Sequence, residues 1–152
     1  MLRFNIGPVS EGTLRTEDLL AAYEWTLRAL VRKGFAKGIA RAALKLCREA
    51  DSADPDSEDA EFILDEMASL LNDLAPPYCY FGASDGDGAS IGFFISWDAI
   101  EDARRCGELA SGDECPRATK DAPREFLVVN DHGNATLYVK RGNRYVEAWG
   151  CV

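Results

Sequence analysis

The residues best suited to chemistry in this sequence form one acidic stretch. Residues 49–66 hold nine acidic and no basic side chains, so this stretch alone has a net charge of −9, equal to that of the whole 152-residue chain. Closely spaced carboxylates can imitate the phosphates of a nucleic acid and occupy the basic groove of a protein that binds one. The candidate partner-binding residues are therefore Asp51, Asp54, Asp56, Glu58, Asp59, Glu61 and Asp65.

The same stretch also has a plainer interpretation. Acidic side chains stabilise a helix N-terminus, so part of the stretch is expected as the solvated start of a helix. Arg41, Lys45 and Arg48 precede it and could neutralise some of its charge. A solvated, partly neutralised helix face is the default interpretation of such a run.

A glycine-rich segment, Gly82–Gly92, is the second candidate site. Asp85 and Asp87 resemble the start of a calcium loop, but the fifth and twelfth positions are Ala89 and Ser96, so the EF-hand pattern fails. Strand alternation places Phe94 on the face opposite Phe93 and Trp97, where it could contact a partner. Asp85, Asp87 and Phe94 are therefore candidate hairpin-site residues, and a plain hairpin turn is the alternative.

The single histidine and the five cysteines suggest no catalytic or metal site. His132 lies in an expected turn, and the cysteines are Cys47, Cys79, Cys106, Cys115 and Cys151. No CxxC pair occurs, and zinc sites need about four cysteine or histidine ligands. The P-loop, GxSxG and HExxH patterns are also missing. We therefore expect reduced thiols, no catalytic residue, no metal and no cofactor.

Composition narrows the class of partner and the compartment. The pI near 4.6 disfavours direct binding to nucleic acid or to an anionic membrane, because both need a basic face. No apolar run approaches the ~18 residues of a membrane span, and the first residues lack the pattern of a secretory leader. We expect a cytoplasmic protein with a real hydrophobic core.

Helices are expected in the first half of the chain. Apolar residues recur at spacings of three and four from Leu20 to Val31, with Thr16 as the expected N-cap and Gly34 as the end. A second helix is expected at about 36–50. A third should begin at the cap Ser57 and reach Leu74, before the two prolines.

The second half of the chain is typical of strands. Short strands are expected at 78–81, 91–97, 126–129, 136–140 and 145–149, with a long hairpin loop at 82–89 and a short helix near 99–106. This order predicts an α+β fold, with three N-terminal helices packed on one face of a mostly antiparallel C-terminal sheet. We expect a single domain, 1–152, mainly helical over 1–75 and mainly sheet with one short helix over 76–152.

Three segments resemble a family of hypothetical proteins common in bacteriophages and other mobile elements. They are GTLRTEDLL at 12–20, NDLAPPYCYFGASDGDGASIGF at 72–93 and VNDHGNATLY at 129–138. Family members often carry YFGAHxGDGADFGFWP and, later, VNDHGNVTLY. This chain departs from that pattern at Ser84, Ser90 and Phe94-Ile95, where the family has His, Asp and Trp-Pro. The resemblance implies a phage or mobile-element context but no reaction.

Two hypotheses about function follow, and a third about assembly. The first is a non-enzymatic accessory protein, for example a counter-defence or anti-CRISPR inhibitor. It would bind a basic surface of a host or defence protein, such as a restriction or CRISPR complex, through residues 49–66. The alternative is a small enzyme or ligand-binding domain that uses the Gly82–Gly92 hairpin and His132. A purely structural homodimeric module is the third.

Overall fold

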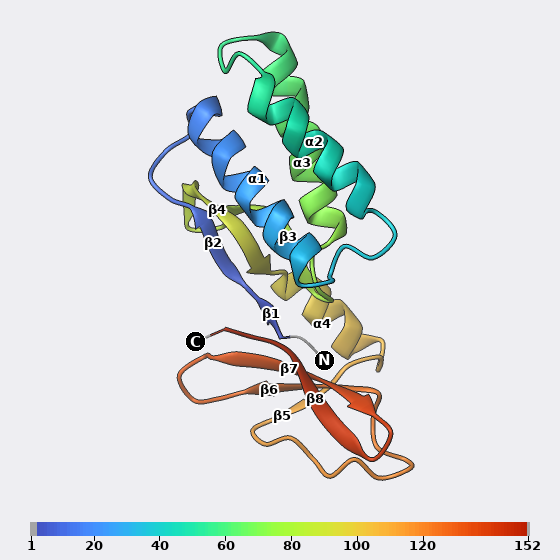
Figure 1. The fold of residues 1–152 in the computed structure, drawn as a ribbon. Coiled ribbons are helices and arrows are strands. Elements are labelled where there is room, and N and C mark those ends of the chain that lie inside the picture. Colours follow the sequence, from blue (N-terminus) through green and yellow to red (C-terminus); the bar gives the residue numbers. More distant parts are fainter. Residues whose placement is uncertain (1–2, 152) are drawn as a thin grey trace. The chain divides into compact units, whose positions relative to one another are not determined.

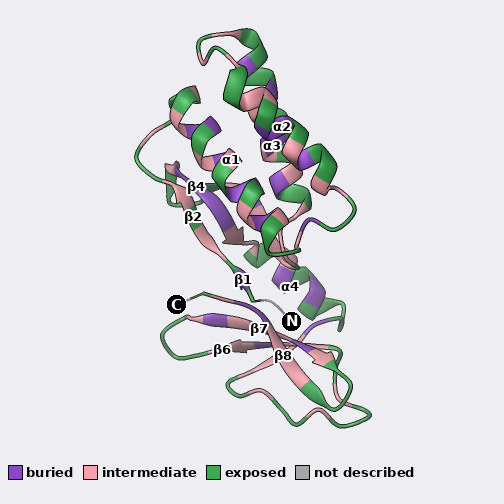
Figure 2. Cartoon of the chain, in the orientation of Figure 1, coloured by how far each residue is buried: buried purple, intermediate pink, exposed green. Residues whose placement is uncertain are grey.

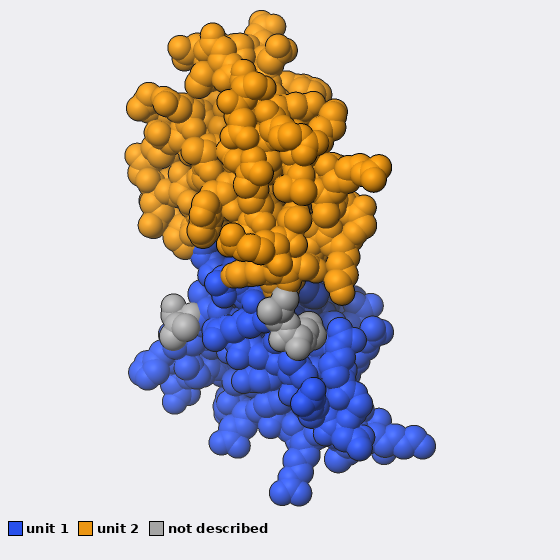
Figure 3. Space-filling model, viewed as in Figure 1, with its two compact units in different colours: residues 1–7, 76–78, 95–152 blue, residues 8–75, 79–94 orange. Residues whose placement is uncertain are grey.

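The computed structural model describes residues 3–151 and shows an α+β chain whose contacts form two compact units (Figures 1 and 3). Unit 1 consists of residues 1–7, 76–78 and 95–152, and unit 2 consists of residues 8–75 and 79–94. Each unit therefore combines segments that are far apart in the sequence.

Three helices form most of unit 2 (Figure 1). Helix α1 spans Thr16–Arg32, α2 spans Ala40–Ser52 and α3 spans Glu58–Asp73. Each contacts the other two, because each has an apolar stripe at helical spacing. Buried and exposed positions alternate along all three helices (Figure 2). The fully buried side chains include Leu27 of α1, Cys47 of α2, and Met67 and Leu71 of α3.

A three-stranded sheet completes unit 2. Its strands are β2 (Gly7–Ser10), β4 (Asp87–Ile95) and β3 (Cys79–Ser84), in the order β2-β4-β3. The ring of Phe81 lies 5.1 Å from that of Tyr23 and 4.9 Å from that of Phe93, so β3 packs on α1 through aromatic contacts. Only two residues separate β3 from β4, which makes them an antiparallel hairpin.

Unit 1 is built on a five-stranded mixed sheet. Its order is β1 (Phe4–Asn5), β8 (Arg144–Cys151), β7 (Ala135–Arg141), β6 (Glu125–Val129) and β5 (Ala110–Gly112). The three long strands pair antiparallel, whereas β1 pairs parallel with β8 and β5 pairs parallel with β6. Helix α4 (Trp97–Arg105) belongs to the same unit. The core of unit 1 includes Ile100, Leu127, Leu137 and Trp149.

A three-residue connector, Pro76–Tyr78, joins α3 to β3 but belongs to unit 1. The indole nitrogen of Trp149 donates to the carbonyl of Pro77 at 2.7 Å, and Ser96 N donates to the carbonyl of Tyr78 at 2.8 Å. Tyr78 has φ = 62°, a left-handed conformation that non-glycine residues rarely adopt. The chain passes between the two units four times, at residues 7–8, 75–76, 78–79 and 94–95.

The expected α+β class is confirmed, as are the three early helices, the short fourth helix and the C-terminal meander. The Ser57 cap is also confirmed: its Oγ accepts from Ala60 N at 3.1 Å. The expected order of three helices followed by one sheet is not confirmed, since strands precede and follow the helices and form two sheets.

Three local predictions are wrong. Thr16 is not the cap of α1: the cap position is Arg15, without a side-chain cap bond. The hairpin loop expected at 82–89 is mostly strand, because β3 continues to Ser84 and β4 begins at Asp87. Trp97 does not share a strand face with Phe93, since β4 ends at Ile95 and Trp97 begins α4, where it is exposed.

Candidate functional site

The acidic residues singled out in the sequence gather where α2 ends and α3 begins. Asp51 lies in the last turn of α2, Asp54 and Asp56 lie in the connecting loop, and the remaining four lie on α3. All seven are exposed. We call them, with Glu66, the acidic surface. The structure therefore brings the predicted partner-binding residues together at one corner of unit 2.

Local hydrogen bonds define the loop that carries this surface. Asp54 Oδ1 accepts from the backbone N–H of Asp56 at 3.1 Å, and Ser57 Oγ donates to the carbonyl of Asp54 at 2.6 Å. The first turn of α3 contains Glu58, Asp59 and Glu61, whose negative charges interact favourably with the positive end of the helix dipole. Part of the acidic stretch thus stabilises the helix start, as the plainer interpretation requires.

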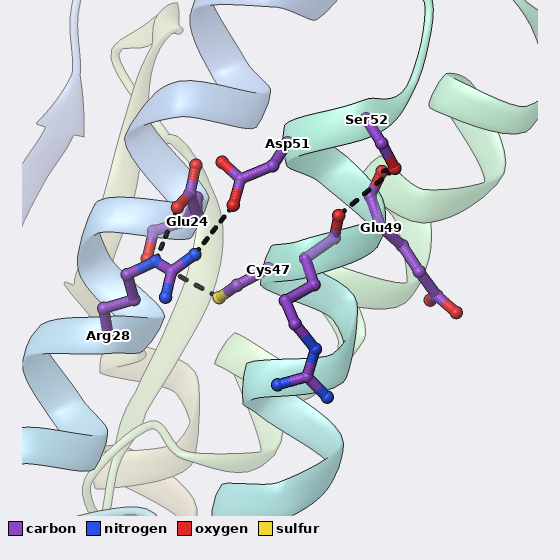
Figure 4. Close-up of polar contacts among 7 residues, drawn as sticks. Glu24, Arg28, Cys47, Glu49, Asp51 and Ser52 are labelled. Atoms are coloured by element: carbon purple, nitrogen blue, oxygen red, sulfur yellow. Dashed lines mark hydrogen bonds and ion pairs between the residues drawn. The ribbon is translucent and has the colours of Figure 1, made fainter.

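Neutralisation by neighbouring cations reaches only the end of α2. Lys45 pairs with Glu49 at 3.1 Å. Figure 4 shows the second pair, in which Arg28 of α1 contacts Asp51 at 2.9 Å. Arg28 also forms an ion pair with Glu24, which lies one turn before it on α1. Over residues 3–151 the other seven acidic side chains of 49–66 form no ion pair, and neither do Arg41 and Arg48. Most of the acidic charge is therefore left for a partner or solvent.

An exposed aromatic ring stands within the acidic surface. Phe62 of α3 is 63% exposed, and helical spacing places Glu58, Asp59 and Glu66 around it, at three and four residues' distance. Large exposed apolar side chains that are ringed by polar residues are typical of protein–protein contacts. Sequence reasoning missed Phe62; the available signal was that it falls outside the buried α3 stripe of Ile63, Met67 and Leu71.

An open groove of about 300 Å³ lies between α2 and α3. Its lining includes Leu46 and Leu70, which supply apolar area, the cation Lys45 on the α2 side, and Glu66 and Asp73, which supply negative charge on the α3 side. Phe62, Glu66, Ser69 and Asp73 follow one another at spacings of four, three and four, so they form one row along α3. Phe62 therefore lies on the same side of α3 as these groove residues, one turn nearer the N-terminus of the helix than Glu66.

The charge of Asp65 acts on a residue of α1. Burial, and secondarily the charge of Asp65, raise the pKa of Tyr23, whose ring is buried against Phe81. Asp65 thus lies on the α1 side of α3, at the edge of the acidic surface.

Of the hairpin candidates, Asp85 lies in the turn between β3 and β4, whereas Asp87 and Phe94 lie in β4. Asp85 and Asp87 are exposed; Asp87 Oδ1 accepts from Ala89 N at 2.9 Å, which fixes the start of β4. Phe94 is half-buried against Tyr80, with ring centroids 6.1 Å apart. The hydroxyl of Tyr80 donates to the carbonyl of Ala83 at 2.9 Å. These contacts give Asp87 and Phe94 structural roles.

His132 lies in unit 1, on the turn between β6 and β7, and is exposed. Asn130 Oδ1 accepts from the backbone N–H groups of His132 and Asn134, both at 3.0 Å, and Gly133 has φ = 80°. The phrase VNDHGN is therefore a side-chain-stabilised turn. Similarly, Asn72 Oδ1 accepts from Phe81 N at 2.9 Å. Two polar residues of the resemblance segments thus satisfy backbone groups.

The described residues contain no cluster of three or more histidine, cysteine or acidic side chains arranged to hold a metal ion. Of the cysteines, Cys47 is buried, whereas Cys106 and Cys151 are exposed. None of the described helices combines the length and apolar character needed to cross a membrane.

Comparison of the chain with protein-family models, with curated proteins and with solved structures finds no match.

Proposed function

We propose that this chain is a non-enzymatic accessory protein of a bacteriophage or other mobile element. In this proposal it binds a basic surface of a host or defence protein, such as a restriction or CRISPR complex, through the acidic surface. The observation that carries the proposal is the concentration of unpaired carboxylates around one exposed ring, Phe62. The resemblance to phage and mobile-element proteins supplies the context.

Charge and an apolar anchor have different roles in such a contact. A field of like charges raises the association rate with an oppositely charged partner and is weakened by salt. An exposed aromatic ring contributes affinity once it is desolvated at the centre of an interface. The acidic surface offers both, because Phe62 lies among carboxylates with no cation of their own.

The test begins with the intact chain as bait in a host lysate, followed by affinity measurements on the purified stoichiometric partner. Replacing Asp54, Asp56 and Asp59 with Asn, and Glu58 and Glu61 with Gln, should weaken binding about tenfold or more at low salt. The matched control neutralises five exposed carboxylates of unit 1: Asp98, Glu101, Asp113, Glu114 and Asp131. Affinity that survives the first change, or falls equally in the control, would contradict the proposal.

The anchor is tested separately from the charge. Phe62→Ala should reduce affinity about tenfold or more and mainly speed dissociation. Trp25→Ala is the matched control, since Trp25 is an exposed aromatic residue (71%) on another helix of unit 2. If both substitutions lowered affinity equally, Phe62 would have no special role.

A further inference from the structure

The net charge of the chain is unevenly divided between its units. Unit 2 carries sixteen acidic and eight basic side chains, a net of −8, whereas unit 1 carries ten acidic and nine basic ones, a net of −1. The acidity of the whole chain therefore says little about the surface of unit 1. Its positive charges concentrate at one end of the five-stranded sheet.

The tip of the β7–β8 hairpin is the centre of this positive end. Strand β7 ends at Arg141, β8 begins at Arg144, and only Gly142 and Asn143 lie between them (Figure 1). All four residues are exposed. Gly142 has φ = 61°, and a Cβ added there would meet nothing within 4 Å, so the turn is open to solvent.

The segment before β6 brings two more cations to the same end. Lys140 Nζ donates to the carbonyls of Lys120 and Ala122 at 3.0 and 3.1 Å, and Lys140 N donates to the carbonyl of Arg124 at 2.8 Å. The Tyr145 hydroxyl also donates to the carbonyl of Pro123. These bonds fasten the segment beside the hairpin. An open groove of about 350 Å³, lined by Ala122, Arg124, Lys140 and Gly142, lies between them.

We call Lys120, Arg124, Arg141 and Arg144 the basic tip. Over residues 3–151 none of the four forms an ion pair. The acidic residues of the adjoining segments are Asp121, which is exposed, and Glu125, which accepts a hydrogen bond from Tyr78. The basic tip therefore retains its charge for an external anion.

The register sets two of these cations directly against each other. Arg141 pairs with Arg144 across the antiparallel ladder. Like charges at directly opposed positions of a β-ladder are destabilising. A bound anion would remove this repulsion, because it would place negative charge between the two guanidinium groups. The arrangement thus lowers the stability of the unbound protein, and a polyanionic ligand would restore that stability.

We propose that the basic tip binds the phosphodiester backbone of a double-stranded nucleic acid. Guanidinium groups bind phosphate oxygens with paired hydrogen bonds, and three of the four cations are arginines. The tip presents arginines from both strands of the β7–β8 hairpin and from the segment fastened beside it, so several phosphates of one backbone can be contacted together. The contacts are to phosphates, so binding is independent of base sequence. This activity does not depend on the proposed function of the acidic surface.

The experiment uses the intact chain and measures fluorescence anisotropy of labelled duplexes of about 20 base pairs, one of DNA and one of RNA with the same mixed sequence. Four phosphate contacts predict a slope of about −3.6 for log K against log salt, so affinity should fall roughly 150-fold between about 50 and about 200 mM salt. The two duplexes distinguish the source of the phosphodiester. A labelled polyglutamate peptide is the third probe.

Arg141→Gln with Arg144→Gln is the central variant. With two contacts removed, the same increase in salt should lower affinity only roughly 12-fold. The thermal midpoint should stay equal or rise, because the like-charge pair is gone. The double substitution to lysine should keep the wild-type salt slope. Arg104→Gln with Arg105→Gln on α4 is the matched control, since it makes the same charge change in the same unit at exposed positions.

Four results would overturn the proposal. They are no binding of either duplex at about 50 mM salt, a slope that the central variant leaves unchanged, an equal loss in the α4 control, and tighter binding of polyglutamate than of both duplexes. The last result would identify an acidic protein as the ligand in place of nucleic acid.

Discussion

The hydroxyl of Tyr78 donates a 2.9 Å hydrogen bond to the carboxylate of Glu125, and so ties the connector Pro76–Tyr78 to strand β6. The same residue has a left-handed backbone conformation, which is strained for any residue other than glycine. The hydrogen bonds of the connector offset this cost. Tyr78 is therefore a structural residue whose contribution can be measured.

Tyr78→Phe should lower the free energy of unfolding by about 1 kcal/mol at neutral pH, because it removes the bond to Glu125 while keeping the ring. Urea denaturation of both proteins measures the difference. Tyr80→Phe is the control, since its hydroxyl bonds the carbonyl of Ala83 at the exposed hairpin. An unchanged free energy in Tyr78→Phe would show that water replaces the lost bond fully.

The stabilising effect of Tyr78 should also depend on pH. Burial, and then the hydrogen bond with Glu125, raise the pKa of Tyr78 from 10.0 to about 12. Since the folded state favours the neutral phenol, its contribution is complete below pH 10.0 and is lost as pH rises toward about 12. The gap in unfolding free energy between wild type and Tyr78→Phe should therefore shrink over this range. A gap that widens with pH would contradict the assignment.

Trp149→Phe should destabilise unit 1 by roughly 2–4 kcal/mol, because it leaves a cavity and an unpaired carbonyl at Pro77. Trp149 is fully buried, whereas Trp97 of α4 is 45% exposed. Trp97→Phe should change stability by less than about 0.5 kcal/mol. Thermal unfolding measures both, and acrylamide quenching should show that the protected tryptophan emission disappears only in Trp149→Phe.

Ser57→Ala should cost about 1 kcal/mol, since Ser57 caps α3 through the bond from Ala60 N. Ser52→Ala is the matched control: the Ser52 hydroxyl donates to carbonyls near the end of α2 and caps no helix start (Figure 4). Chemical denaturation of the two variants measures the difference. Equal costs would mean that the cap bond contributes nothing specific.

Cys47 should resist alkylation in the folded protein. It is fully buried, and burial raises the pKa of its thiol. The reactive thiolate is thereby disfavoured, whereas Cys106 and Cys151 are exposed. Mass spectrometry after iodoacetamide treatment at about pH 8 should find Cys106 and Cys151 modified first. Early modification of Cys47 would show that the helices of unit 2 open readily.

Local sequence signals predicted the elements whose determinants are local. The apolar stripe of α1, the Ser57 cap of α3 and the turns of the C-terminal meander each arise within a few residues. The predicted cap Thr16 was wrong by one residue: the helix already includes Thr16, and the cap position Arg15 makes no side-chain cap bond. Helix ends are uncertain by one or two residues when no cap bond fixes them.

Long-range pairing could not be predicted in the same way. Strand β1 has two residues and β5 has three, so neither is long enough to show an alternation of apolar and polar residues. Strand β1 pairs parallel with β8, which is distant in sequence, and β5 pairs parallel with β6, which follows a loop. The ion pair between Arg28 and Asp51 depends on the packing of α1 beside α2. The acidic surface was predictable from composition, whereas Phe62 and the Arg141–Arg144 register needed the three-dimensional arrangement.

The pairing of β1 with β8 has a consequence for synthesis on the ribosome. Phe4 pairs with Trp149 and Asn5 with Gly150, so unit 1 unites the earliest and latest parts of the described chain. The segments of unit 2, in contrast, have all been made once residue 94 has emerged. Because domains generally fold as their segments become available, unit 2 should acquire its core early in translation, while unit 1 must wait until Trp149 and Gly150 have been made.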